Sequence, residues 1–238
     1  MFTVLGFTRR LVKLHPVIGV YNLSTTIVGA MTLAVDDNTQ RTEREEIDLQ
    51  MMRRCLELSK IAARQGELPF ASLIARNGKI VAEATNRVTR DCDVTRHAEL
   101  LALSDAQRAT GKKRLPDYTI YSNIEPCAMC SFPIREARIS RVVFSIKSPL
   151  MGGYSRWNVL CDDGISNAMP EAFGDAPEIL SGVLAREAEK VWRDWNPLVW
   201  TIIKKRGCFT AAEECCDKWH KAPGQQSLLR RFLTSLDW

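Results

Sequence analysis

Two cysteines stand three positions apart in the stretch NIEPCAMCSF, residues 123–132, directly behind a proline. If Cys127 and Cys130 lie on the first turn of a helix, their sulfurs share one face and can reach the same metal ion. The positive end of the helix dipole favours the thiolate form, which binds metal. His97, thirty residues upstream of Cys127 in TRHAELLAL, supplies a nitrogen. One nitrogen and two sulfurs suit Zn²⁺ and leave its fourth tetrahedral position open.

A carboxylate follows the histidine closely. An open zinc position usually holds water, and the metal lowers the pKa of that water to about 7. Glu99 lies two residues after His97, so its carboxylate can take a proton from the water and hand it to a leaving group. The residues therefore predict a metal-assisted reaction in which Glu99 shuttles the proton.

Other uses of Cys127 and Cys130 explain fewer of these residues. The chain has eight cysteines, and an even number could form disulfides, but the chain is long and has no confident secretory signal. A redox pair would not explain the His-Ala-Glu triplet. A structural zinc site needs a fourth Cys or His nearby as a ligand, and His15 and His220 are remote in sequence.

The surrounding sequence predicts alternating helices and strands. The expected elements are a helix over 42–66 with a Thr42–Glu45 capping box, a hairpin over 69–86 turning at Asn77-Gly78, a helix over 98–111, a strand over 117–123, a helix from Pro126 to about Arg138, a strand over 141–146, a helix over 178–195, and a strand or short helix over 197–203. This order predicts an α/β protein with a layered sheet.

The motifs together resemble a known superfamily. His97-Ala98-Glu99 and Pro126-Cys127-Ala128-Met129-Cys130 have the spacing of zinc nucleobase deaminases. The pieces LPFASLIARNGKIVAEATNRV, DVTRHAELLAL, TIYSNIEPCAMC and ARISRVVFS carry the likeness in order. Over about residues 45–160 the chain resembles the cytidine deaminase-like superfamily, nearest to its guanine deaminases and tRNA adenosine deaminases. The resemblance implies a three-layer α-β-α sandwich with a mixed sheet of about five strands, a Zn²⁺ cofactor and a homodimer.

The resemblance also implies roles for single residues. Glu99 would be the proton shuttle, and Asn86 would bind the base or sugar of the substrate. Phe70 would line the pocket, and the backbone N–H of Ala98 would hold a ring carbonyl or nitrogen. Asn86 could instead simply end a strand, and Phe70 could belong to the core. Arg96 stands where many relatives have alanine; a surface salt bridge explains it better than a phosphate contact.

The predicted function is zinc-dependent hydrolytic deamination of a small nucleobase or nucleoside to the oxo product and ammonia. A guanine-like purine is favoured because residues 36–203 carry a net charge of −1, whereas gripping an RNA loop normally takes several Lys/Arg contacts. The stretch GGYS at 152–155 resembles a glycine-rich loop of tRNA adenosine deaminases. Deamination of adenosine in tRNA therefore stays open, as do a cytosine or cytidine deaminase and a zinc-binding, inactive partner subunit.

The two ends of the chain are harder to interpret. Residues 1–40 form an uncertain N-terminal extension, either a targeting segment or an overlong start before Met31, followed by a deaminase domain over 41–206 and a C-terminal tail over 207–238. Hydrophobic residues make up 45% and charged residues 26%, without the long apolar run of a spanning helix. These features predict a cytoplasmic protein without a membrane partner, unless residues 1–35 direct it to an organelle.

Overall fold

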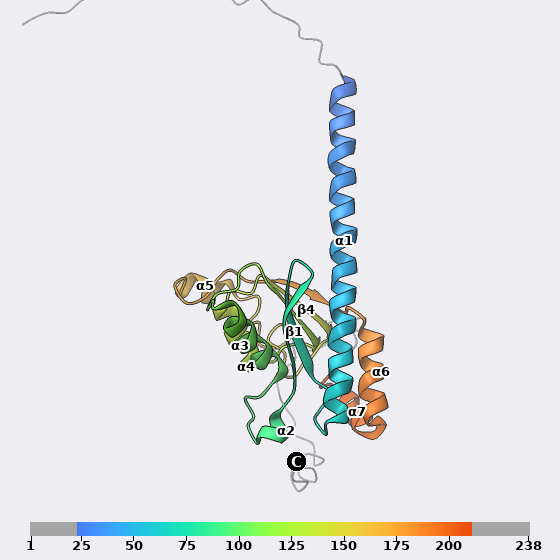
Figure 1. The fold of residues 1–238 in the computed structure, drawn as a ribbon, viewed down its shortest axis with the longest axis vertical. Helices are drawn as coiled ribbons and strands as arrows, with labels where there is room; N and C mark the ends of the chain where they lie inside the picture. The colour runs from blue at the N-terminus through green and yellow to red at the C-terminus, as the bar shows by residue number, and fades with distance from the viewer. Residues whose placement is uncertain (1–22, 211–238) are drawn as a thin grey trace, which may run out of the picture. The chain divides into compact units, whose positions relative to one another are not determined.

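The computed structural model describes residues 23–210, with side chains from residue 39 onward. The chain divides into two compact units, residues 1–43 and 44–238. Helix α1, Leu23–Arg64, begins in the first unit and ends in the second. The second unit carries all the other helices and strands (Figure 1). The rest of the description concerns that unit.

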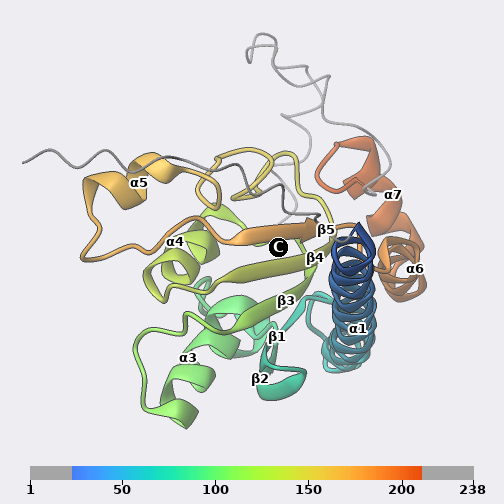
Figure 2. The same cartoon turned by 90° about the horizontal axis from the view of Figure 1, so that it is seen from above.

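A five-stranded sheet forms its centre, with the strand order β2-β1-β3-β4-β5 (Figure 2). The strands are β1 (Ala71–Arg76), β2 (Lys79–Thr85), β3 (Thr119–Ile124), β4 (Arg141–Ile146) and β5 (Glu178–Ser181). Strand β1 pairs antiparallel with β2 and β3, whereas β4 pairs parallel with β3 and β5. The sheet is therefore mixed, as predicted.

Helices cover both faces of this sheet. They are α2 (Val88–Asp91), α3 (Ala98–Thr110), α4 (Ala128–Glu136), α5 (Asp163–Ala168), α6 (Ala185–Trp195) and α7 (Pro197–Lys205). Seen from above, α3 and α4 lie on one side of the strands, and α1 and α6 lie on the other (Figure 2).

Neighbouring strand residues explain this layering. Side chains alternate between the two faces of a strand, and in this sheet both faces are buried. Ile120 on β3 packs with Ala102 of α3 and Ile134 of α4. Its neighbour Tyr121 packs on the opposite face with Met51 of α1. The two cores confirm the three-layer α-β-α sandwich.

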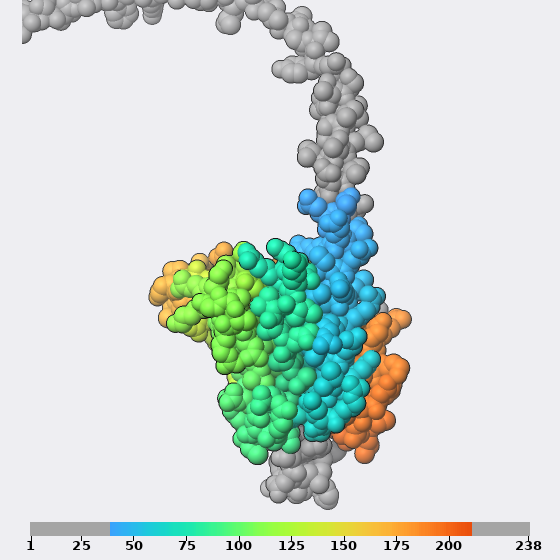
Figure 3. Space-filling view, in the orientation of Figure 1, coloured from blue at the N-terminus to red at the C-terminus, as the bar shows by residue number. Residues whose placement is uncertain are grey.

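A third apolar cluster joins α1 to the C-terminal helices. Leu56 of α1 packs with Ala188 and Trp192 of α6 and with Trp200 of α7. In the space-filling view the orange surface of α6 and α7 lies directly beside the cyan surface of α1 (Figure 3). Trp192 and Trp200 are buried and belong to this part of the core.

Three element boundaries differ from the prediction. The capping box at Thr42 is wrong, because α1 begins at Leu23 and Thr42 lies inside it. Pro126 does not open α4; Cys127 is the N-cap residue and Ala128 begins the helix. The helix predicted over 178–195 is wrong in its first part, because residues 178–181 pair with β4 as a fifth strand. A short apolar run fits a strand or a helix equally well. Here residues 178–181 form a strand because the edge of β4 is free to pair with them.

Two other local predictions are confirmed. Asn77 and Gly78 have φ of 49° and 70°, which are the left-handed values that a tight hairpin turn requires. Residues 197–205 form a helix, with Pro197 in its first turn and the Asn196 side chain accepting a hydrogen bond from the Val199 N–H over 3.1 Å. In the part of the chain that the structure describes, no helix has both the length and the apolar character needed to cross a membrane.

Candidate active site

The predicted metal ligands lie at the N-termini of two helices on the same side of the sheet. His97 is the N-cap residue of α3, and Cys127 is the N-cap residue of α4. Cys130 lies in the first turn of α4. Strand β3 ends at Ile124, three residues before Cys127, so the sheet fixes the start of α4 next to the start of α3. The dipoles of both helices direct positive potential at this point.

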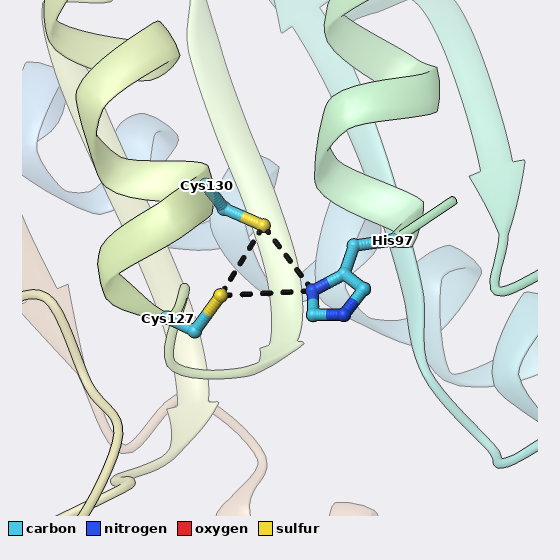
Figure 4. A group of neighbouring side chains, drawn as sticks. All are labelled: His97, Cys127 and Cys130. Atoms are coloured by element: carbon cyan, nitrogen blue, oxygen red, sulfur yellow. Dashed lines mark hydrogen bonds between the residues drawn. The ribbon is translucent and has the colours of Figure 1, made fainter. Parts of the chain in front are cut away.

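The three side chains point toward one another (Figure 4). The Cys127 and Cys130 sulfurs are 3.6 Å apart, and His97 Nδ1 lies 3.6 Å from the first and 3.5 Å from the second. Ligands of one tetrahedral zinc, at about 2.3 Å for sulfur and about 2.0 Å for nitrogen, stand roughly 3.5–3.8 Å from each other. The observed triangle therefore has the size that a single Zn²⁺ needs.

The sulfurs differ in their protonation. The Cys127 and Cys130 side chains share a hydrogen bond, and this contact, with a further contribution from His97, lowers the pKa of Cys127 to about 4. The same contact, together with burial, raises the pKa of Cys130. The hydrogen bond with Cys127 raises the pKa of His97. Cys127 is thus held as a thiolate, the form that binds metal.

The Glu99 side chain is buried beside this triangle. Its Oε1 accepts a hydrogen bond from the Ser122 hydroxyl over 3.3 Å, and its Oε2 lies 3.8 Å from Cys130 Sγ. Burial raises the pKa of the Glu99 carboxyl to about 7. A carboxyl group with a pKa near neutrality can both accept and return a proton.

A small pocket opens at the ligand triangle. Its cavity volume is about 80 Å³, and its walls are lined by Phe70, Asn86, His97, Glu99, Ile124, Glu125, Cys127, Ser148, Met151 and Phe209. Two residues that the resemblance placed at the substrate, Phe70 and Asn86, are therefore in the pocket wall. Ala98 is fully buried at the start of α3 and is not in the wall.

Sequence reasoning missed the buried carboxylate that holds Asn86. Glu67 Oε2 accepts from the Asn86 side-chain amide over 3.0 Å, and the two Glu67 oxygens also accept from the backbone N–H groups of Thr89 and Arg90. Because one N–H of the Asn86 amide donates to Glu67, the amide oxygen and the second N–H are left for other partners. Only the Glu-x-Pro spacing before Phe70 could have drawn attention to Glu67.

A second missed carboxylate, Glu125, fixes the loop on the other side of the pocket. It is 2% exposed and accepts from the backbone N–H groups of Ser148, Tyr154 and Ser155 over 2.7–2.9 Å. A Cβ atom at Gly152 would stand 2.0 Å from Glu125 Oε1. The glycine of GGYS is therefore required by this close approach, a physical reason that the sequence pattern did not reveal.

The C-terminal side of the domain also reaches the pocket. Phe209, assigned to a tail by the sequence, is 4% exposed and packs edge-on against Trp192 and Phe70, with ring centroids 5.3 Å and 6.1 Å away. Backbone hydrogen bonds between Lys147 and Thr210 hold this segment beside the end of β4. The described part of the tail is thus a wall of the site.

Arg96, next to the ligand histidine, pairs with Asp93 over 3.0 Å. This confirms the salt-bridge interpretation. The other motif singled out, Cys215-Cys216 with His220, lies outside the described residues.

Comparison with known proteins gives the family. The profile described as "Cytidine and deoxycytidylate deaminase zinc-binding region" matches residues 45–146. A tRNA-specific adenosine deaminase from Bacillus subtilis is 32% identical over 137 residues, which are 57% of this chain and 80% of that protein. The chloroplastic tRNA(adenine(34)) deaminase of Arabidopsis thaliana is 34% identical over 125 residues, 52% of this chain but only 10% of that protein. The chain thus covers only a small part of the length of some relatives.

Two solved structures share the fold. One, from a study of A-to-I editing by tRNA:A34 deaminases, is 29% identical with a TM-score of 0.52 and covers 60% of this chain and 98% of its own. The other, from work on the guanine deaminase of Nitrosomonas europaea, is 22% identical with a TM-score of 0.51 and covers 63% and 84%. The structures show the shared fold, and the B. subtilis relative, 32% identical and covered to 80%, together with the matched profile gives the family: this chain belongs to the deaminase family defined by the cytidine and deoxycytidylate deaminase zinc-binding region.

Proposed function

We propose that the protein is a hydrolytic deaminase in which His97, Cys127 and Cys130 hold Zn²⁺ and Glu99 moves the proton. The observation that carries this proposal is the ligand triangle with sides of 3.5–3.6 Å beside a buried carboxyl group. Bound Zn²⁺ supplies Lewis acidity, which makes water a nucleophile near neutral pH.

The chain's own residues perform the remaining work. Glu99 would accept a proton from the attacking water and deliver it to the ring nitrogen beside the attacked carbon. It would then move the proton of the new hydroxyl to the exocyclic nitrogen, so that the C–N bond breaks, ammonia leaves and a carbonyl remains. Ser122 keeps the carboxylate in place through its 3.3 Å hydrogen bond. Phe70, Ile124 and Phe209 line the pocket with apolar surface, which holds a flat base and limits access of bulk water.

For the substrate we infer adenosine in tRNA, converted to inosine. The B. subtilis relative, of which the chain covers 80%, is named as a tRNA-specific adenosine deaminase. The N. europaea guanine deaminase, at 22% identity, shares the fold alone. This inference replaces the sequence-based preference for free guanine. That preference rested in part on the net charge of residues 36–203, and the likeness to relatives named as tRNA-specific adenosine deaminases outweighs it.

One exposed surface supports an RNA substrate. Trp157 is 57% exposed, and the Arg156 guanidinium lies 5.4 Å from the centre of its ring. The backbone N–H of Trp157 donates to the carbonyl of Gly152 over 3.0 Å, and Gly152 follows Met151 of the pocket wall. An exposed aromatic ring beside a pocket is suited to stacking on an unpaired base that flanks the target.

The experiment compares substrates. Inosine formation in a tRNA anticodon stem-loop is measured beside ammonia release from guanine, adenine, cytosine and their nucleosides. We expect turnover of the stem-loop, abolished in a Glu99→Ala protein that keeps its zinc. Deamination of guanine without any turnover of the stem-loop would instead support the sequence-based preference for free guanine. A protein that holds zinc and deaminates no compound in this set would be the inactive partner subunit.

We also propose that the protein works as a homodimer. Met129 and Phe132 on α4 are 38% and 46% exposed, which leaves apolar surface directly behind the metal ligands. Burial of such a surface against a second copy would stabilise the assembly. Light scattering at micromolar concentration tests this, and a monomer there would contradict it. The cytoplasmic location and the domain limits at residues 40 and 206 likewise stay predictions.

A further inference from the structure

A buried arginine lies on the helix that carries the two cysteines of the ligand triangle. Arg135 is in the last turn of α4 and is 1% exposed. Its guanidinium donates to four uncharged oxygens of one segment: the carbonyls of Val159, Asp162 and Gly174, over 2.8–3.3 Å, and the Ser166 hydroxyl. An arginine has five N–H donors in a fixed fork, so a single side chain can bind all four acceptors. Arg135 therefore attaches a loop to the metal-binding helix.

The attached loop has few other backbone partners. Residues 147–177, all of which the structure describes, contain one short helix, α5, and no strand. Most carbonyls of this segment therefore belong to neither a helix nor the sheet. Val159 and Leu160 are nevertheless buried, at 6% and 0% exposure. A buried carbonyl without a hydrogen bond is unfavourable, so the Arg135 guanidinium supplies the partner that secondary structure supplies elsewhere.

The loop is attached to α4 at two places, and Trp157 lies between them. At the first place the Gly153 N–H donates to the Pro126 carbonyl over 2.8 Å, just before α4 begins. At the second, near the end of the helix, Arg135 donates to the Val159 carbonyl over 2.8 Å. Trp157 is four residues after the first attachment and two residues before the second. Because both attachments are to the same helix, together they decide where the Trp157 ring stands.

We propose that Arg135 is a positioning residue for Trp157. By holding the Val159 carbonyl on α4, it keeps the exposed ring where an RNA base that flanks the target can stack on it. This rests on the proposed RNA substrate, and it adds a residue outside the pocket wall on which recognition of RNA depends. A free nucleoside has no flanking base, so its turnover should not depend on Arg135.

Arg138 supplies a matched control. It lies two residues after the end of α4, and its guanidinium also donates to carbonyls of the loop. Its acceptors are Pro170 and Glu171, which lie at least thirteen residues beyond Trp157. Arg135→Met and Arg138→Met each keep a long unbranched side chain and remove the donors. Arg135→Lys keeps the charge but lacks the planar fork, so it can bind fewer of the acceptors.

Steady-state kinetics on the RNA stem-loop and on a free nucleoside test the proposal, with every variant folded and loaded with zinc. Arg135→Met should raise KM for the stem-loop about fivefold, part of what a stacked base contributes, with kcat within about twofold. Arg135→Lys should raise KM by a smaller factor. The constants for the nucleoside, and those of Arg138→Met on both substrates, should stay within about twofold. An equal rise in KM for both substrates, or none for the stem-loop, would overturn the proposal.

A double-mutant cycle shows whether Arg135 acts through Trp157. If it does, Trp157→Ala/Arg135→Met should match Trp157→Ala in its KM for the stem-loop within about twofold, because no ring is left to position. A merely structural defect would act independently of the ring. The two increases in KM would then multiply in the double variant, and that result contradicts the proposal.

Hydrogen exchange of the free protein separates this proposal from the proposed function, because it needs no substrate. In Arg135→Met the backbone amides of residues 154–162 should exchange about tenfold faster than in the parent, whereas those of α3 should not change. Arg138→Met should leave the exchange of residues 154–162 as it is. Unchanged exchange there in Arg135→Met would overturn the proposal even in an active enzyme. Faster exchange in a protein that does not turn over the stem-loop would support the attachment and contradict the RNA substrate instead.

Discussion

The buried carboxylate of Glu67 accepts a hydrogen bond from the side-chain amide of Asn86 over 3.0 Å. The bond determines which end of the amide is presented to the pocket. Glu67 also accepts two backbone N–H groups from α2, so it cannot rotate away without leaving them unsatisfied. Glu67 is therefore a positioning residue for Asn86.

Glu67→Gln should impair substrate binding while leaving zinc in place. A glutamine side chain has one acceptor oxygen and a donor amide, so it cannot accept from Asn86 and from both backbone groups. We expect KM to rise about tenfold or more, with kcat less affected. The control is Glu57→Gln, since Glu57 is an exposed partner of Arg54. Equal kcat and KM in Glu67→Gln and the parent would show that Asn86 needs no such support.

Removal of one metal ligand should remove the zinc. We expect one Zn²⁺ per chain by elemental analysis, and a Cys127→Ala protein should lose it on dialysis against a mild chelator because two ligands remain. Cys92→Ala is the matched control, because Cys92 is an exposed cysteine outside the triangle. Full zinc content in Cys127→Ala would contradict the assigned ligand set.

Gly152 should tolerate no side chain. Its substitution by alanine places Cβ 2.0 Å from Glu125 Oε1 and forces the loop over 148–155 to move. We expect the free energy of unfolding to fall by about 1–3 kcal/mol, as for other overpacked buried sites. Urea denaturation measures it. Asn167→Ala, at an exposed position of the surface helix α5, should change the free energy of unfolding by no more than about 0.5 kcal/mol. A similarly small effect at Gly152 would argue against the contact.

Trp157 offers a test that is specific for RNA. Stacking of a base on an aromatic ring contributes about 1–3 kcal/mol, so Trp157→Ala should raise KM for the stem-loop about tenfold or more. Turnover of a free nucleoside, which has no flanking base, should stay within about twofold. Leu198→Ala serves as the control, because Leu198 is also exposed but lies on α7. Loss of activity on both substrates would indicate a general defect of the loop.

The sequence by itself predicted the parts of the site that depend on local geometry. Cys127 and Cys130 are one helical turn apart, and His97 and Glu99 are two residues apart at the next helix start, so their chemistry could be inferred from spacing. The hairpin turn at Asn77-Gly78 was equally local, because a left-handed φ is needed there. The order of helices and strands predicted the layered sheet for the same reason: periodicity is visible within each segment.

Tertiary structure decided what depends on distant segments. Glu67, Glu125 and Ser148 look like ordinary polar residues in the sequence, and only the meeting of strand ends buries them around one pocket. Residues 178–181 became a strand because the edge of β4 was free to pair, whereas their own apolar pattern fitted a helix as well. Phe209 joined the pocket because α6 and α7 return the chain to it. Burial and pairing between remote segments leave no pattern within a short stretch of sequence. The metal ligands and the proton shuttle could therefore be predicted from the sequence, whereas the residues that line the pocket became known only from the fold.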